Sequence, residues 1–177
     1  MLQLKQSDKE DKTIQQPENG RIILGSVMGL VATAAVALSV PSFAQDSGLA
    51  FWDRGGCSTC HGAVADGGGG DAEPEGPSLR RTELNRELLI ETISCGRPGA
   101  AMPYHLIGAY TKTSCYGLPV GDAPAEVNGA GIFTAEEVAA LVDFLLKNVV
   151  GKTKVTREGC AVFFGGDKNA IDCRYFR

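Results

Sequence analysis

Apolar residues recur at helical spacing in one long segment towards the end of the chain. Between Thr134 and about Val150 they stand three or four positions apart, so a single face of a helix would carry them all. Thr134 is followed three positions later by Glu137, which is the pattern of a capping box at a helix start. We therefore predict an amphipathic helix over 134–150, ended by Gly151. Its apolar positions are Val138, Leu141, Val142, Leu145, Leu146 and Val149.

Two more helices are predicted earlier in the chain. Asp46 or Ser47 can cap a short helix over 49–52, which a pair of glycines ends. Thr82 can cap a second helix that runs to Cys95 and carries its apolar side chains on one face. The apolar positions of this second helix are Leu84, Leu88, Leu89 and Ile93.

The segments between the predicted helices read as loops. Residues 62–77 and 96–131 are rich in glycine and proline, and the first is also acidic. Neither shows the alternation of apolar and polar residues that is typical of a strand. The sequence therefore predicts an all-α fold.

The N-terminal segment predicts export from the cytoplasm. Residues 22–40 form an apolar run without a charge, and Ser42-Phe43-Ala44 follows with the small-x-small pattern of a cleavage site. Residues 1–44 are therefore expected to be a signal peptide. The run is also long enough to span a bilayer, so an uncleaved anchor is the alternative. In both cases we expect the rest of the chain in the periplasm, held at the membrane only if this segment is retained.

Charge and length limit the possible partners. The chain has 17 lysines and arginines against 21 aspartates and glutamates, a net charge of −4. An acidic chain is poorly suited to bind nucleic acid, so no such partner is expected. The exported part is long enough for one domain. We place this domain at 45–151, followed by a basic C-terminal extension over 152–177.

The most specific motif is Cys57-Ser58-Thr59-Cys60-His61. In C-x-x-C-H, two thiols reach the two vinyl groups on one porphyrin edge, and the adjacent imidazole binds the iron. A disulfide or a thioredoxin-like pair is the alternative, but it would call for a βαβ pattern that the sequence lacks. We therefore predict one covalently bound haem c, attached through Cys57 and Cys60, with His61 as an axial ligand.

The second axial ligand is predicted by elimination. Met102 is the only methionine after the export segment, and the irregular stretch 99–103 around it could cover the far face of a haem. His105 is the only other histidine besides His61, so it is the first alternative; an open or water-bound iron is the second. Histidine and methionine together would leave no position for oxygen or peroxide, which favours electron transfer.

These residues resemble class I c-type cytochromes over about residues 46–150. Gly76-Pro77-Ser78-Leu79 is similar to the Gly-Pro-x-Leu element of that family. The resemblance implies that the Pro77 carbonyl accepts a hydrogen bond from the Nδ1–H of His61. It also implies a small cytochrome c-like helical fold around one haem, here with extra loops and a disulfide-linked C-terminal tail.

Two arginines, Arg80 and Arg81, directly follow this element. A charge-assisted hydrogen bond from either one to a haem propionate would be favourable. Two surface arginines before a helix are the alternative reading.

Four further cysteines, at 95, 115, 160 and 173, indicate a resemblance to a smaller group within that family. Together with Cys-Gly-Arg-Pro-Gly-x-x-Met-Pro-Tyr-His, they are similar to the four-extra-cysteine cytochromes associated with bacterial methanol and related alcohol oxidation. That likeness implies electron transfer from a quinoprotein alcohol dehydrogenase to a terminal oxidase or another cytochrome.

The pairing of these four cysteines stays open, because four cysteines allow three pairings. Local closure favours Cys95–Cys115 and Cys160–Cys173. A four-thiolate zinc site is the alternative, although the spacings are wide for one.

The function that these features predict is a periplasmic mono-haem electron carrier, and not an enzyme. Two alternatives remain. One is a haem enzyme, either a peroxidase or a gas-binding protein, in which Met102 is displaceable. The other is a haem subunit bound permanently to a dehydrogenase.

Overall fold

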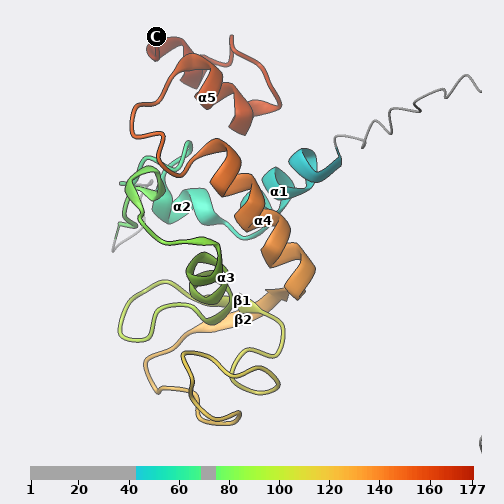
Figure 1. Ribbon diagram of the computed structural model, residues 1–177. Coiled ribbons are helices and arrows are strands. Elements are labelled where there is room, and N and C mark those ends of the chain that lie inside the picture. Colours follow the sequence, from blue (N-terminus) through green and yellow to red (C-terminus); the bar gives the residue numbers. More distant parts are fainter. Residues whose placement is uncertain (1–42, 69–74) are drawn as a thin grey trace, which may run out of the picture. The chain divides into compact units, whose positions relative to one another are not determined.

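The computed structural model describes residues 43–68 and 75–177 (Figure 1). Nearly all of the predicted export segment and the middle of the acidic loop lie outside the described residues. Within the described ranges, no helix combines the length and the apolar character that crossing a membrane requires.

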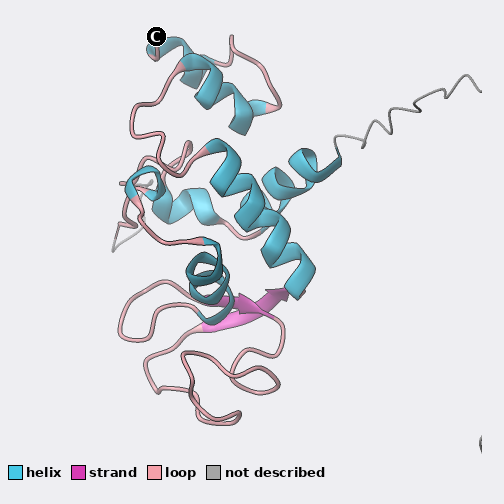
Figure 2. Ribbon diagram, viewed as in Figure 1, coloured by secondary structure: helices cyan, strands magenta, loops and turns pink. Residues whose placement is uncertain are grey.

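The described chain combines helices and long loops with one small two-stranded sheet (Figure 2). The prediction of an all-α fold was therefore incomplete. The α-helices are α1 (Phe43–Arg54), α2 (Cys57–His61), α3 (Arg86–Cys95), α4 (Ala135–Asn148) and α5 (Arg157–Ala161). The 3-10 helices are η1 (Leu79–Arg81), η2 (Val162–Phe164) and η3 (Ile171–Tyr175), and the strands are β1 (Tyr104–Leu106) and β2 (Gly129–Phe133).

The predicted capping box at the start of α4 is confirmed. The Thr134 hydroxyl accepts the Glu137 N–H at 3.3 Å, and the Glu137 carboxylate accepts the Thr134 N–H at 2.9 Å. Two backbone donors that the helix itself cannot satisfy are thereby paired. The apolar face of α4 is buried, which is what the spacing predicted.

Helices α1 and α4 cross in contact with each other (Figure 1). Gly48 of α1 lies against Phe144 of α4 at this contact. A Cβ on Gly48 would overlap the Phe144 side chain and come within 3.0 Å of the Ala140 carbonyl, so a residue without a side chain is needed there. Helix α1 begins at Phe43, earlier than predicted, and Asp46 and Ser47 therefore lie within it instead of capping it. It ends at the predicted place, before the glycine pair.

The prediction of Thr82 as a helix cap was wrong. Asn85 caps α3, because its side-chain oxygen accepts the Leu88 N–H at 2.9 Å. Thr82 closes η1 instead, and its hydroxyl accepts the Leu84 N–H at 3.3 Å. Both residue types can cap a helix, so residue type alone does not choose between them.

The segment expected to be a loop over 96–131 contains β1 and the start of β2. The two strands are parallel, with Tyr104 opposite Gly129 and Leu106 opposite Phe133. The Tyr104 N–H also donates to the Asn128 carbonyl at 2.8 Å. Strands this short carry too few residues to show an alternating pattern, which is why the sequence did not predict them.

The C-terminal extension packs on the crossing of α1 and α4. Phe163 of η2 lies edge-on to Trp52 at 5.4 Å and to Phe144 at 5.6 Å, measured between ring centroids. Trp52 is almost fully buried. The extension thus completes the core.

Candidate functional site

Helix α2 carries the C-x-x-C-H motif. Gly56 precedes it in a left-handed conformation, with φ at 62°, which suits glycine. Cys57 and Cys60 are half-buried on this single short helix, and His61 ends it. The helix therefore holds both thiols and the imidazole within a few residues.

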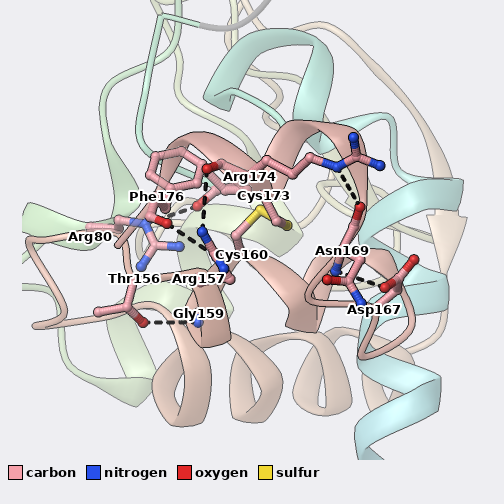
Figure 3. The surroundings of a disulfide bond; sticks show 11 residues. Arg80, Thr156, Arg157, Gly159, Cys160, Asp167, Asn169, Cys173, Arg174 and Phe176 are labelled. Atoms are coloured by element: carbon pink, nitrogen blue, oxygen red, sulfur yellow. Dashed lines mark hydrogen bonds between the residues drawn. A yellow bond between two sulfur atoms is a disulfide. The ribbon is translucent and has the colours of Figure 1, made fainter.

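The cysteines of the described residues fall into two groups. The structure contains the disulfides Cys95–Cys115 and Cys160–Cys173, so the pairing that local closure favoured is confirmed. Figure 3 shows the second of these bonds. The zinc alternative was wrong, because all four sulfurs are used in these bonds. Cys57 and Cys60 are the only free cysteines among the described residues.

His61 is fixed by the hydrogen bond that the resemblance implied. Its Nδ1 lies 2.8 Å from the Pro77 carbonyl oxygen, and only 8% of the residue is exposed. A carbonyl oxygen only accepts, so Nδ1 must carry the proton. The lone pair of a neutral His61 ring is then on Nε2, the nitrogen left to bind a metal.

Gly76 allows the Pro77 loop to come this close to His61. A Cβ on Gly76 would lie 2.9 Å from Nδ1 of His61 and 2.8 Å from the Cys60 carbonyl oxygen. The Gly76 N–H donates to that same carbonyl at 2.8 Å. The loop is therefore held directly against the end of α2.

The surroundings of Cys57 disfavour thiol–disulfide exchange. Burial raises the pKa of the Cys57 thiol to about 12, so it is protonated at neutral pH. The thiolate is the reactive form in exchange reactions, and exchange-active cysteines have lowered pKa values. The thioredoxin-like reading of C-x-x-C therefore loses support.

His105 is a buried histidine close to the same helix. Its ring stacks on Phe133, with 5.6 Å between the centroids, and its buried Nδ1 has no hydrogen-bond partner within residues 43–68 and 75–177. Burial lowers the pKa of His105; the backbone of Gly55 counters this shift, whereas the charge of His61 adds to it. The structure thus brings the two histidines within electrostatic reach of each other.

Met102 lies half-buried against the core, on a turn fixed by backbone hydrogen bonds. The Arg97 N–H donates to the Met102 carbonyl at 3.0 Å, and the Ala100 N–H donates to the Arg97 carbonyl at 2.9 Å. Gly96 packs directly beneath this turn, where a Cβ would come within 2.8 Å of the Met102 carbonyl oxygen. The thioether is thus carried on a well-defined loop.

Arg80 is the site residue whose surroundings the sequence could not predict. Only 1% of it is exposed, whereas Arg81 is exposed. Its Nε donates to the Val64 carbonyl at 2.9 Å and its Nη1 to the Lys152 carbonyl at 3.2 Å. Its Nη2 is buried and has no hydrogen-bond partner among the residues that the structure describes. Burial lowers the pKa of this guanidinium, and Asp66 partly opposes that shift.

Two further observations bear on the function of this site: one concerns metal-binding groups and the other the similarity to known proteins. Among the residues that the structure describes, no group of three or more histidine, cysteine, aspartate or glutamate side chains could hold a metal ion. Comparison with protein-family models, with curated proteins and with solved structures finds no match.

Proposed function

We propose that this protein is an exported mono-haem c-type cytochrome that carries single electrons. One observation carries the proposal: Cys57 and Cys60 stay free beside a histidine whose Nδ1 is taken by a backbone carbonyl. Four other cysteines in the same chain are joined in disulfides. A pair of neighbouring thiols left out of that pairing, next to an oriented imidazole, suits covalent attachment of a haem.

The buried polar atoms near this helix also fit a haem. Arg80 Nη2 is a charged donor without an acceptor in the described part of the chain, and a haem brings two propionate carboxylates that could accept from it. The Arg80 guanidinium donates to two neutral carbonyls, and Asp66 opposes the effect of burial on its pKa without accepting a hydrogen bond from it within the described residues. An anionic acceptor at Nη2 would therefore stabilise the buried charge further. When bound, the haem supplies a one-electron iron couple.

In this proposal, each residue of the site has a defined task. Cys57 and Cys60 attach the porphyrin, and Nε2 of His61 binds one face of the iron. The Pro77 carbonyl holds the imidazole in orientation and raises its basicity. Met102 is proposed as the ligand on the other face, with His105 as the alternative. With both faces occupied, the protein would exchange electrons without binding oxygen.

The pathway is proposed from the resemblance alone. It would take electrons from a quinoprotein alcohol dehydrogenase, as in methanol oxidation, and pass them to an oxidase or another cytochrome in the periplasm. The close crossing of α1 and α4 at Gly48 supports a class I-like helical arrangement.

Intact mass of the protein, expressed with its N-terminal segment in a host that attaches haem c, tests the proposal. We expect the mass of one haem, and loss of that mass in Cys57→Ser/Cys60→Ser. Cys95→Ser/Cys115→Ser is the matched control, since it removes two other cysteines and should keep the haem. A haem-free wild type with Cys57 and Cys60 oxidised to a disulfide would overturn the proposal.

Ligand binding at the iron, measured on the same protein, tests the alternative that the protein is a haem enzyme. A peroxidase or gas-binding protein would bind cyanide or carbon monoxide at the iron as isolated. The proposed carrier should resist both ligands, because both axial positions are filled.

A further inference from the structure

An open groove lies beside the turn that carries Met102. It has a volume of about 400 Å³, and its lining is mostly apolar, with the Arg97 guanidinium and the Tyr116 hydroxyl as the polar side-chain groups of its lining residues. The lining residues are Arg97, Pro98, Tyr116, Leu118 and Pro124.

The groove is built on the backbone of the Met102 turn. The Tyr116 hydroxyl donates to the Gly96 carbonyl at 2.5 Å, and Arg97 donates its N–H to the Met102 carbonyl. The disulfide from Cys95 to Cys115 joins the two walls immediately before Gly96 and Tyr116. A molecule seated in the groove would therefore touch the segment that holds the proposed ligand.

Tyr116 is held in a conformation that an aromatic residue rarely adopts. Its φ is +52°, in the left-handed region that favours glycine. Such a conformation is unfavourable for a residue with a side chain and persists only where neighbouring contacts impose it. The adjacent disulfide and the hydrogen bond from the Tyr116 N–H to Glu91 do so here. Since 41% of Tyr116 remains exposed, core packing alone does not account for this strain.

Arg97 gives the groove its charge. The residue is exposed, and no side chain or carbonyl in the described part of the chain accepts a hydrogen bond from its guanidinium. The carboxylate of Glu91 accepts the Tyr116 N–H instead. The groove thus combines an unpaired cation with an aromatic ring and two prolines, and tyrosine and arginine are the residue types that dominate binding energy at protein interfaces.

We propose that this groove docks a redox partner protein, which inserts an apolar side chain against Tyr116 and places a carboxylate on Arg97. The inference rests on the proposed function, which supplies the reason for a partner. A protein fits better than a small molecule, because small-molecule sites hold several convergent polar groups and this groove has one charged side chain. An acidic group on the partner complements the unpaired guanidinium.

A dipeptide of the same chemistry tests the groove directly. N-acetyl-phenylalanyl-aspartate amide is titrated into the reduced holoprotein, followed by NMR, with the asparagine analogue as the neutral control. We expect shifts confined to residues 96–98, 116–118 and 124, with the aspartate peptide binding several-fold more tightly. In Arg97→Gln the two peptides should bind equally. Shifts located elsewhere, or equal binding of both peptides to the wild type, would overturn the proposal.

Two further variants test whether a change in peptide binding arises at the groove or from a general change in charge or folding. Lys112→Gln removes another exposed cation of the same long loop and should leave the peptide preference unchanged. Tyr116→Asn removes the ring but tolerates the left-handed backbone, so the fold should survive while peptide binding falls at least several-fold. Undiminished binding to Tyr116→Asn would show that the groove is not the site. Haem content is measured by mass on the same samples, so a failure of the proposed function appears separately from a failure of docking.

Discussion

Gly76 lies so close to His61 that a Cβ at position 76 would come 2.9 Å from Nδ1 of the imidazole. The Gly76→Ala variant should push the loop off the end of α2 and lengthen the hydrogen bond from His61 to Pro77. We expect a loss of about 1–3 kcal/mol in the free energy of unfolding, because the added methyl meets backbone atoms that cannot yield easily. Chemical denaturation measures this loss.

Gly159→Ala is the control for that variant. Gly159 lies within α5, and a Cβ there would meet only ordinary contacts, at 3.4 Å from Thr156 and 4.0 Å from Arg80. This change should be neutral or slightly stabilising, since alanine favours a helix. Equal unfolding free energies for the wild type and Gly76→Ala would contradict the close packing at His61.

A second prediction concerns the buried guanidinium that ties the C-terminal extension to the site. Arg80→Met should leave the Val64 and Lys152 carbonyls without their donor, at a cost of about 2 kcal/mol in unfolding free energy. Arg81→Met, at the exposed neighbour, should cost almost nothing. Proteolysis of the extension should also quicken only in Arg80→Met, because that variant loses the hydrogen bond from the Arg80 guanidinium to the Lys152 carbonyl of the extension. Identical behaviour of the two variants would remove Arg80 from this role.

Local signals made parts of the fold predictable. The capping box of Thr134 and the spacing of apolar residues lie within one helix, so the sequence carries all the information for α4. The disulfides close short loops, with partners 20 and 13 positions apart in the sequence, so local closure chose them correctly. The pairing of β1 with β2 instead depends on residues some distance apart, which no local pattern records.

The candidate site also contains some residues that local sequence patterns predicted and others that they did not. Cys57, Cys60 and His61 form a contiguous motif, and the Gly-Pro-x-Leu element pointed to Pro77. The burial of Arg80 arises only when the extension folds over it, and Arg80 and Arg81 look alike in sequence. The proximity of His105 to His61 likewise depends on the tertiary fold, and no local sequence pattern indicates it.

A third prediction concerns pH and the link between α1 and α4. The Arg54 guanidinium, 2.7 Å from Glu137, lowers the pKa of that carboxyl below its ordinary value of 4.5. Since the folded pKa lies below the unfolded one, this stabilisation is complete above about pH 4.5 and is lost as the pH falls through the folded value. Glu137→Gln should therefore lower Tm at pH 7, and the difference should shrink as the pH falls below 4.5 and through the lowered pKa of Glu137.

The control for this prediction is Asp122→Asn, at an exposed carboxylate. It should leave the dependence of Tm on pH as in the wild type. A Tm difference for Glu137→Gln that stays constant from neutral to acidic pH would mean that the ion pair with Arg54 is not its source. Thermal unfolding followed by circular dichroism at several pH values gives the result.

The last prediction identifies the second axial ligand of the proposed haem. Met102→Ala removes the only thioether after residue 44, so the sixth position should pass to water, an added ligand or His105. Each of these stabilises the ferric iron relative to methionine, so the reduction potential should fall well below that of the wild type. The haem should stay attached, because Cys57 and Cys60 are unchanged. Redox titration with absorption spectroscopy measures both effects.

Variants of His105 distinguish which group takes the sixth position of the iron. It is buried with a free Nδ1 and stacks on Phe133, so a rearranged loop could bring it to the iron in place of Met102. Met102→Ala/His105→Ala should therefore bind cyanide or carbon monoxide readily, whereas His105→Ala alone should keep the spectrum of methionine ligation. If His105→Ala abolishes low-spin ligation while Met102→Ala leaves spectrum and potential unaltered, the iron is held by two histidines and the assignment of Met102 is wrong.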